Sequence, residues 1–282
     1  MPELPEVETV IRGLKKTVGG KTIESVKVNY DKYNLDNQPG WAKKLPGCRI
    51  TGIRRRGKNI LIDLDNDHTL WVHLKMTGKF RQTKPDEPRD KHDLVTFDFE
   101  PNGKKAGAGG AQQLRFNDYR RFGRLRLFRN DELMLQPGLA ELGPEPLEIT
   151  PNDFVKLCKR RPRMIKAALM DQSFLAGIGN IYADEALYAS RIHPARSINS
   201  LSRAKLIELH GHIQRLLRLS IDRMGTTVIS YVNVNGDSGS FQNMLKVYAR
   251  EGEPCERCGA TIVREKLGSR SAHYCPRCQR KL

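Results

Sequence analysis

The first residues of the chain carry apolar side chains with the period of an amphipathic helix. Pro5 lies near the first turn of this segment, and Gly19 and Gly20 follow its last apolar position. Proline is favoured in the first turn of a helix, and glycine just beyond its end. The pattern therefore predicts a helix that begins close to the first residue and buries Val7, Val10, Ile11, Leu14 and Val18.

Between residues 21 and 129 the pattern changes to short runs that alternate apolar and polar residues. Gly, Pro, Asn and Asp separate these runs, as is typical of strands joined by turns, so we expect a β-sandwich or a barrel. Residues 101–113 are small, polar and basic, and they predict a hairpin loop without a role in the chemistry. The predicted strands lie in KTIESVKVNY, GCRITGIRR, KNILIDLD, HTLWVHLK, HDLVTFDFE and GRLRLF.

Helical periodicity returns after a connecting segment that is rich in turn residues. It covers FVKLCKRRPRMIKAALMDQ, NIYADEALYASRI and SRAKLIELHGHIQRLLRLSIDRMG, and we expect the leucines of the last segment to be core residues. Residues 225–243 are rich in Gly, Ser and Asn and predict a flexible loop. The following MLKVYAREGEP, residues 244–254, predicts a short strand.

These patterns predict an α+β protein of several domains. The expected parts are a β-sandwich with a leading helix at 1–130, a linker at 131–149, a helical domain at 150–224, a loop with a connecting strand at 225–250, and a cysteine-rich segment at 251–282.

The charge of the chain indicates a polyanionic partner. The 282 residues carry a formal net charge of +17, with a sequence pI near 9.8. Nucleic acid is the favoured partner, although anionic membranes or solubility alone are alternative explanations. No run of residues approaches the roughly 20 apolar positions that span a bilayer, and the start of the sequence lacks a basic region followed by an apolar run. We therefore expect a cytoplasmic protein without a membrane partner.

The cysteines are distributed as metal ligands rather than as disulfide partners. Cys255-x2-Cys258 and Cys275-x2-Cys278 lie near the end of the sequence, and each pair can hold one side of a tetrahedral metal ion. Four thiolates leave no open coordination position, so the pattern predicts one structural Zn²⁺. Seven basic residues surround the ligands and favour phosphate contact, although such a zinc ribbon also binds proteins. Cys48 and Cys158 stand alone, and we expect them to be inert core residues.

The first five residues after Met1 can support covalent chemistry. Removal of Met1 leaves the secondary amine of Pro2 close to Glu3 and Glu6. An α-amine has a pKa of roughly 7.7 to 8.0, so a useful fraction is neutral and nucleophilic near pH 7, and carboxylates can move protons. The alternative explanation is capping, because acids in the first turn of a helix stabilise it without any chemistry.

Basic and aromatic residues are interleaved in three further segments. These are RRRGKN at 54–59, HLKMTGKF at 73–80 and NDYRRFGR at 117–124. Arg and Lys suit contacts with backbone phosphates, and an apolar side chain such as Met76 or Phe122 can fill the space left by an extruded nucleotide. Each segment taken alone also fits a solvated strand edge or a core position.

Taken together, these segments resemble the formamidopyrimidine-DNA glycosylases. The motifs occur in the same order over essentially the whole chain: PELPEVET, RRGKN, HLKMTG, DYRRFG, GIGNIYADEAL and YCPRCQ. The resemblance implies an N-terminal β-sandwich, a helix-two-turn-helix domain and a zinc finger, with damaged duplex DNA bound between the domains. It also implies base-excision repair of oxidised purines, namely 8-oxoguanine and formamidopyrimidines, by a glycosylase that is also an AP lyase.

By this resemblance the catalytic residues lie at both ends of the chain. Pro2 attacks C1′ of the damaged nucleotide and forms a Schiff base, after which β,δ-elimination cleaves the strand. Glu3 protonates the sugar ring oxygen, Glu6 relays protons, and Lys58 assists catalysis while contacting phosphate. Arg270 of the finger grips phosphate and belongs to the same catalytic set.

The resemblance also assigns the residues that hold DNA. Met76, Arg120 and Phe122 match the three side chains that fill the void after base extrusion, with the arginine facing the orphaned cytosine. Asn180 matches a phosphate-binding asparagine, and the loop at 225–243 matches a lesion-capping loop. The remaining DNA-binding assignments are His73, Lys166 and Arg270.

Two departures from the family pattern and two alternative functions remain open. Tyr119 stands where proline or valine is frequent, and Thr77 stands where some members place a glutamate. An enzyme of the endonuclease VIII branch would act on oxidised pyrimidines, but that branch typically starts Pro-Glu-Gly-Pro. A catalytically silent zinc-dependent DNA-binding protein would need no free Pro2. In every case we expect a monomer in the cytoplasm, associated with the nucleoid.

Overall fold

A computed structural model describes residues 1–101, 113–160, 162–226 and 239–281. These residues form two compact units. The N-terminal unit comprises Met1–Ala140 and Met224–Ser240, and the C-terminal unit comprises Glu141–Arg223 and Phe241–Leu282. Within the described ranges, none of the helices has the length and apolar character needed to cross a membrane.

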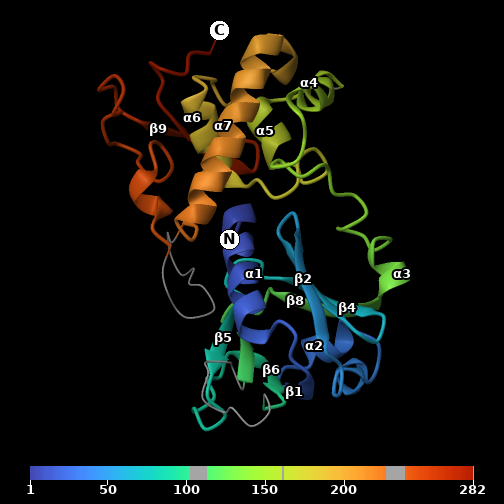
Figure 1. Ribbon diagram of the computed structural model, residues 1–282. Coiled ribbons are helices and arrows are strands. Elements are labelled where there is room, and N and C mark those ends of the chain that lie inside the picture. The colour runs from blue at the N-terminus through green and yellow to red at the C-terminus, as the bar shows by residue number, and fades with distance from the viewer. Residues whose placement is uncertain (102–112, 161, 227–238, 282) are drawn as a thin grey trace. The chain divides into compact units, whose positions relative to one another are not determined.

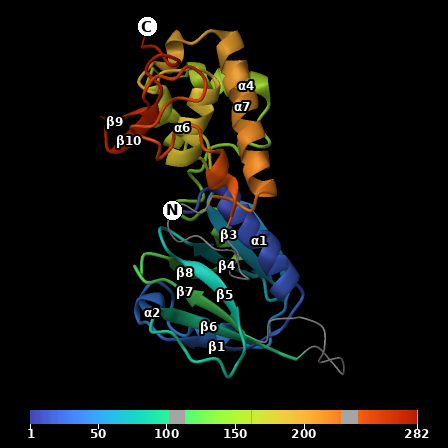
Figure 2. The same cartoon turned by 90° about the vertical axis from the view of Figure 1, so that its left-hand side faces the viewer.

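Two four-stranded antiparallel sheets make up most of the N-terminal unit. One sheet has the order β1-β6-β7-β5 and the other the order β2-β3-β4-β8 (Figures 1 and 2). The strands are β1 (Ile23–Val28), β2 (Ile50–Arg56), β3 (Asn59–Leu64), β4 (His68–His73), β5 (Lys79–Thr83), β6 (Asp93–Phe99), β7 (Gln113–Asn117) and β8 (Arg124–Arg129). Side chains from both sheets share one apolar core, so the predicted β-sandwich is confirmed.

The predicted first helix is present as α1 (Leu4–Val18), which packs against β2 and β3 (Figure 1). Its five predicted apolar residues are all buried, with at most 2% of any of them exposed. The unit also contains three short helices, α2 (Lys32–Leu35), η1 (Trp41–Lys44) and α3 (Asn130–Leu133). The predicted hairpin loop at 101–113 lies outside the described residues apart from its ends, of which Gln113 already belongs to β7.

Helices dominate the C-terminal unit. Its long helix is α7 (Arg203–Asp222), against which α4 (Pro151–Lys159) and α6 (Asn180–Ala189) pack. The helical segment predicted around residue 160 is interrupted: α4 ends before Pro162, and α5 (Ile165–Met170) begins beyond it, because proline cannot continue the hydrogen-bond ladder. Two short helices, η2 (Ile198–Ser200) and η3 (Phe241–Met244), complete the set.

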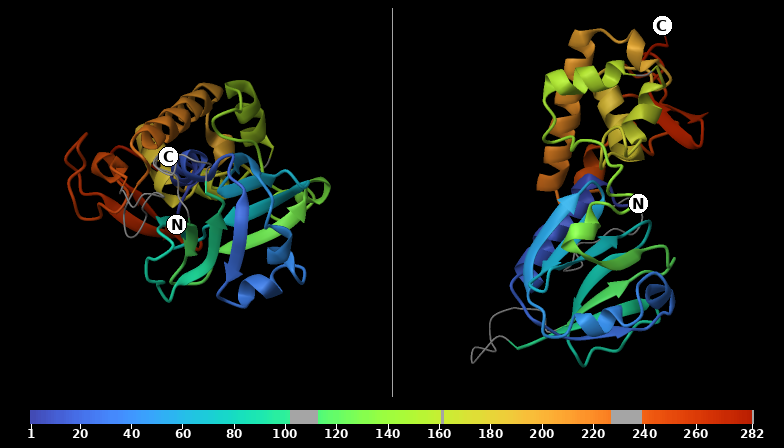
Figure 3. Two further views of the ribbon diagram at one scale, coloured as in Figure 1. Left: turned by 60° about the horizontal axis from the view of Figure 1, so that its bottom comes forward. Right: turned by 90° about the vertical axis from the view of Figure 1, so that its right-hand side faces the viewer.

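A β-hairpin follows these helices and carries the cysteine-rich segment. It consists of β9 (Val263–Leu267) and β10 (Arg270–Tyr274), and it stands out from the helices in the right-hand view of Figure 3. The strand predicted at 244–254 is wrong, because these residues form the end of η3 followed by bends and turns. Three of their backbone N–H groups, those of Lys246, Val247 and Tyr248, donate to the Glu185 carboxylate instead of to a neighbouring strand.

Candidate active site and nucleic-acid interface

Two carboxylates at the start of α1 are withdrawn from solvent. Glu3 and Glu6 are 3% and 2% exposed, and Pro2 beside them is also buried. The Glu3 N–H donates to Glu6 Oε2 at 2.8 Å, so the Glu6 side chain satisfies a backbone donor that the helix leaves open. The capping explanation of this acidic segment is therefore confirmed, and it leaves both carboxylates beside the terminal amine.

The electrostatics around the terminal amine favour its neutral form. In the structure this amine belongs to Met1, the residue before Pro2. Burial is the largest influence and lowers the pKa of the amine, whereas the two glutamates raise it and Lys58 and Arg120 lower it again. The net effect is a pKa of the Met1 amine below its ordinary value, because burial outweighs the two carboxylates.

Glu6 also binds a backbone donor from a distant part of the chain. The Thr226 N–H donates to Glu6 Oε1 at 2.8 Å. Gly225 precedes it with φ +83°, and a Cβ at Gly225 would lie 3.0 Å from Glu6 Cγ. A Cβ at Gly239 would lie 2.2 Å from the Gly225 carbonyl oxygen. The chain thus enters and leaves the N-terminal unit close to Glu6, where Gly225 and Gly239 lie against each other; we call this close approach the glycine crossing. Residues 227–238, where most of the expected capping loop falls, are outside the described residues.

Lys58 lies in the tight turn between β2 and β3. Gly57 adopts φ +56°, a conformation that glycine tolerates without strain, and the next residue, Lys58, is only 5% exposed. Because Lys58 influences the terminal amine, the structure brings this residue together with the acidic start of α1.

Two of the three expected void-filling side chains are large apolar groups that remain exposed. Met76 is 40% exposed and Phe122 is 50% exposed. The Arg120 guanidinium lies over the Phe122 ring, 4.8 Å from its centroid. These side chains come from two loops, one between β4 and β5 and one between β7 and β8. Exposed apolar side chains stacked with a cation suit insertion into a base stack.

His73 ends β4 as a neutral histidine. Its Nδ1 accepts the Lys75 N–H at 3.0 Å, so Nε2 carries the proton and can donate. Burial is the main cause that lowers the pKa of His73 to about 3, and the positive charges of Lys75, Lys58 and Arg124 lower it further. A neutral donor of this kind can bind a phosphate oxygen without a change in charge.

Asn180 is the first residue of α6 and follows a glycine-containing turn. Gly177 has φ +91°, and Gln172 braces the turn by accepting the Gly177 N–H at 2.9 Å and donating to the Ile178 carbonyl at 2.8 Å. The Asn180 Oδ1 atom is buried without a hydrogen-bond partner in the described residues. The N-terminus of a helix favours anions, so this turn is suited to hold a phosphate.

Lys166, which the sequence analysis assigned to DNA binding, is buried within the C-terminal unit. Its side chain is 3% exposed, and its Nζ atom donates to Asp184 Oδ1 at 2.6 Å and to the Ser271 carbonyl at 2.5 Å. Asp184 in turn accepts the His273 N–H at 3.0 Å. The contacts of Lys166 therefore tie α5 and α6 to strand β10, and its assignment to DNA binding stays a prediction.

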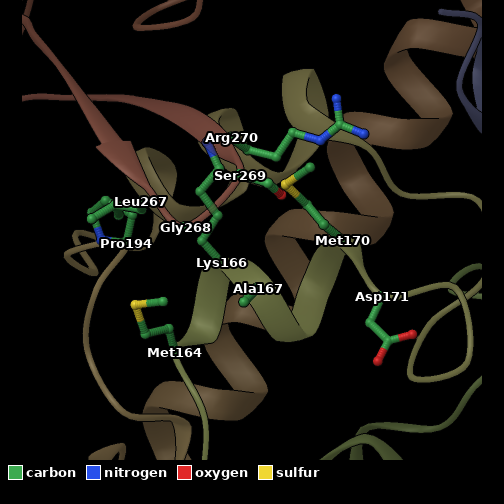
Figure 4. A pocket seen from close by; sticks show the side chains of 10 residues that line it. All are labelled: Met164, Lys166, Ala167, Met170, Asp171, Pro194, Leu267, Gly268, Ser269 and Arg270. Atoms are coloured by element: carbon green, nitrogen blue, oxygen red, sulfur yellow. The ribbon is translucent and has the colours of Figure 1, made fainter.

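Arg270 begins β10 and is exposed, as expected for a phosphate ligand. Figure 4 shows its guanidinium extending away from Lys166, which points from α5 towards the hairpin. The tight turn before it contains Gly268 at φ +62°. A cavity of about 350 Å³ lies between this turn and α5, with Met164 and Met170 among its lining residues.

The four cysteines of the C-terminal segment form a metal site. Their sulfur atoms all lie within 4.8 Å of one another, with 3.4 Å between the Cys258 and Cys275 sulfurs and 3.9 Å between those of Cys255 and Cys278. Zinc–sulfur bonds of about 2.3 Å in a tetrahedron place the sulfurs about 3.8 Å apart, so the four residues fit one Zn²⁺. The Tyr188 hydroxyl lies 3.3 Å from the Cys255 sulfur.

Comparisons with known proteins match each of these parts. Residues 1–125 match the formamidopyrimidine-DNA glycosylase N-terminal domain, residues 142–231 its H2TH domain, and residues 252–280 a zinc finger found in FPG and IleRS. A formamidopyrimidine-DNA glycosylase of Pediococcus pentosaceus is 44% identical over 281 residues, which cover 99% of both chains. The chain belongs to the formamidopyrimidine-DNA glycosylase family.

Other members of the family agree in sequence and in structure. A formamidopyrimidine-DNA glycosylase of Heliobacterium modesticaldum is 44% identical, over 99% of this chain and all of its own length. A solved Lactococcus lactis FPG mutant, in complex with DNA containing Fapy-dG, has a TM-score of 0.90 at 36% identity and covers 99% of this chain and 100% of its own. A MutM complex with DNA containing carbocyclic 8-oxo-G has a TM-score of 0.89 at 36% identity, with the same coverage.

Three buried carboxylates support this formamidopyrimidine-DNA glycosylase site and were missed from the sequence. Asp118, fully buried, accepts the Gly123 N–H at 2.7 Å and the Arg120 N–H at 3.2 Å, which shapes the loop that carries Phe122. Asp184 and Glu185 hold the hairpin and the segment after η3. Asp118 could have been found from the sequence, because aspartate is frequent at the start of a turn. Asp184 and Glu185 lie within a helical segment, where an acidic residue gives no such signal.

Proposed function

We propose that this chain removes oxidised purines from duplex DNA and then cleaves the strand at the resulting site. The observation that carries the proposal is the start of α1, where the buried Pro2 lies beside the buried carboxylates of Glu3 and Glu6, and where Glu3, Glu6, Lys58 and Arg120 all influence the neighbouring terminal amine. A secondary amine in such surroundings is a nucleophile with acids and a cation in reach, which is what glycosyl transfer to an amine requires.

The substrate class follows from the relatives. The L. lactis structure contains Fapy-dG in DNA, and the MutM structure contains carbocyclic 8-oxo-G in DNA. We assign 8-oxoguanine and formamidopyrimidines as the lesions that this chain excises, in a DNA glycosylase with AP lyase activity.

The reaction starts with attack of the Pro2 nitrogen on C1′. The new C–N bond replaces the glycosidic bond, whose electron pair leaves with the protonated base, and Glu3 donates a proton to the ring oxygen as the sugar opens. The resulting iminium acidifies the C2′ proton. Its removal expels the 3′ phosphate by β-elimination, and a second elimination expels the 5′ phosphate, which leaves both strand ends phosphorylated.

DNA contacts are assigned to residues of both units. Met76 and Phe122 occupy the space of the extruded nucleotide, with Arg120 facing the orphaned cytosine. Lys58 and Arg270 bind phosphates next to the lesion and so keep C1′ within reach of the amine.

Neutral donors complete the binding surface. His73, with its protonated Nε2, and the amide of Asn180 at the start of α6 bind further backbone oxygens. Hydrogen bonds from uncharged groups fix the register of the duplex without adding to the salt dependence of binding.

The domains divide this work. We assign catalysis to 1–130, DNA binding to 150–224, lesion capping to the loop within 225–250 and phosphate gripping to the finger at 251–282, with 131–149 as linker. The finger's Zn²⁺ has four thiolate ligands and supplies folding free energy, not Lewis acidity. We propose a monomer that acts in the cytoplasm on the nucleoid.

Borohydride trapping tests the mechanism. Protein whose Met1 has been removed is mixed with a duplex containing one 8-oxoguanine opposite cytosine, reduced, and the crosslink is mapped by mass spectrometry. We expect one covalent adduct at Pro2. A Pro2→Gly variant is the matched control, because it keeps a terminal amine while changing its basicity and conformation.

A DNA-binding module without catalysis is the competing function. It predicts tight, salt-sensitive binding to the lesion duplex with no adduct and no strand cleavage. That result, obtained with trimmed protein, would refute the glycosylase proposal.

A further inference from the structure

A second basic site lies around the zinc cysteines, away from the residues assigned to the lesion. It is a concave surface of about 440 Å³ lined by Cys258 and Cys278 and by five arginines, Arg191, Arg196, Arg257, Arg277 and Arg280. All seven residues belong to the C-terminal unit. We call this surface the arginine pocket.

The arginine pocket lies at the opposite end of α6 from the turn expected to hold DNA. Asn180 begins α6, whereas Arg257 stacks on Tyr188 near its end, 4.4 Å from the ring centroid, and donates to the Tyr188 carbonyl at 3.2 Å. Tyr188 lies eight positions after Asn180 in the helix, which corresponds to a rise of about 12 Å. A phosphate bound at the start of α6 therefore does not reach these guanidinium groups.

The positive charge of the pocket is only partly balanced. None of the five arginines forms an ion pair with a carboxylate in the described ranges. A zinc ion with four thiolates carries two negative charges, so three positive charges remain uncompensated. The position of Arg257 is explained by capping, because cations stabilise the C-terminal end of a helix. The position of Arg277 is explained by its hydrogen bond to the Cys258 carbonyl at 3.5 Å. Neither explanation covers the other three.

One of the remaining arginines has a donor without a partner. Arg196 Nη2 lies 3.4 Å from the Ser200 hydroxyl, but its Nε atom is buried with no hydrogen-bond partner in the part of the chain described. An unsatisfied charged donor is costly unless an acceptor is supplied. Guanidinium groups bind phosphate oxygens through paired hydrogen bonds, which makes phosphate the ligand that such a cluster fits best.

We propose that the arginine pocket is a second phosphate-binding site, separate from the lesion site. Its ligand is a phosphate group, supplied either by a stretch of nucleic-acid backbone remote from the lesion or by free phosphate. The bound anion accepts hydrogen bonds from Arg196 and neutralises Arg191 and Arg280. Since the site shares no residue with the proposed active site, its failure would leave the glycosylase proposal unchanged.

Side-chain NMR of the zinc-loaded full chain tests the pocket directly. The Nε–Hε signals of Arg196 and Arg257 are followed during titration with inorganic phosphate at constant ionic strength, and then with an undamaged duplex. We expect saturable shifts of both signals. Shifts with both probes assign the source to nucleic-acid backbone, and shifts with inorganic phosphate alone assign it to free phosphate.

The variant Arg191→Gln/Arg280→Gln removes two charges from exposed residues whose side chains form no hydrogen bond within the described part of the chain. We expect its half-saturation concentration to rise about tenfold. The matched control, Lys156→Gln/Arg218→Gln, removes the same charge from exposed positions on α4 and α7 and should titrate like the wild type. The proposal would be overturned if all three proteins titrated equally or if millimolar phosphate caused no shift. It would also be overturned if the signals shifted only with a hexaglutamate peptide, which carries negative charge without phosphate.

Discussion

Single residues at this site serve the backbone and the chemistry at once. Both carboxylate oxygens of Glu6 accept backbone N–H groups, one from Glu3 and one from Thr226. A carboxylate held in this way is fixed in orientation, so any proton that it relays moves along a defined direction. The sequence offered capping and chemistry as alternatives for this segment, and the geometry makes them compatible.

The glycine crossing gives the first residue-scale prediction. Gly239→Ala introduces a Cβ that would lie 2.2 Å from the Gly225 carbonyl oxygen, so the backbone at Gly225 or at residue 239 has to shift. We expect a loss of about 1–3 kcal/mol in the free energy of unfolding and slower base excision. Chemical denaturation and single-turnover excision of 8-oxoguanine measure the two effects.

Gly211→Ala on α7 is the matched control, because a Cβ there meets open space. Alanine is the better helix former, so this variant should gain up to about 1 kcal/mol. If the effect of Gly239→Ala acts through Glu6, a double variant with Glu6→Gln loses less than the sum of the two single losses. Additive losses would refute this link.

His73 predicts a specific dependence of stability on pH. Its pKa is about 3 in the folded chain and near 6.5 when unfolded, so between these values only the unfolded chain binds the proton. Stability therefore falls as the pH drops from 6.5 towards 3. In His73→Gln the slope of the free energy of unfolding against pH should be smaller by about 1.4 kcal/mol per pH unit. Urea unfolding at pH 7, 6, 5 and 4 measures this slope. Parallel stability curves for the two proteins would contradict the prediction.

At the scale of elements, hydrophobic periodicity identified most strands and failed where polar residues are buried in pairs. The strand β7 is buried along its whole length although it contains Gln113, Arg115 and Asn117. Arg115 forms an ion pair with Asp93 at 3.3 Å, and both side chains are at most 4% exposed. Such partners come from a distant strand, so neither β7 nor its neighbour β5 could be found from the local pattern. The cysteine spacing, by contrast, determines locally which side chains can bind one metal ion, and it predicted all four ligands.

The segment after η3 gives a prediction at this scale. Glu185 accepts the Lys246, Val247 and Tyr248 N–H groups at 2.9 to 3.0 Å and is 2% exposed. Glu185→Gln keeps the shape but replaces one carboxylate oxygen with an NH₂ group, which faces at least the Lys246 N–H. We expect a loss of about 1–3 kcal/mol in stability, with faster release of zinc to a chelator.

Glu208→Gln on α7 is the control, because Glu208 is exposed and pairs with Lys205 on the surface. It should change stability by less than about 0.5 kcal/mol. If Glu185→Gln released zinc at the wild-type rate, the segment after η3 would not contribute to the stability of the zinc finger.

At the scale of the whole molecule, the charge of +17 predicts strongly salt-dependent binding to DNA. Arg270→Ala should weaken binding to every duplex and reduce the slope of log K against log salt by about 0.9. Removal of zinc should have at least this effect, since the finger that holds Arg270 folds around the metal. Fluorescence anisotropy at several salt concentrations measures the slope, with Arg218→Ala as control. An unchanged slope would remove Arg270 from the phosphate contacts.

The hydrogen bond from Thr226 to Glu6 also sets an order of assembly during synthesis. Its two residues are 220 positions apart, so the ribosome must add the entire helical bundle before the donor exists. At about 5–20 residues per second this takes roughly 10–40 s after Glu6 is made. In a nascent chain, Glu6 can accept the Glu3 N–H, but its second donor is still missing. The hydrogen bonding that fixes Glu6 is therefore complete only after the helices up to α7 have been translated.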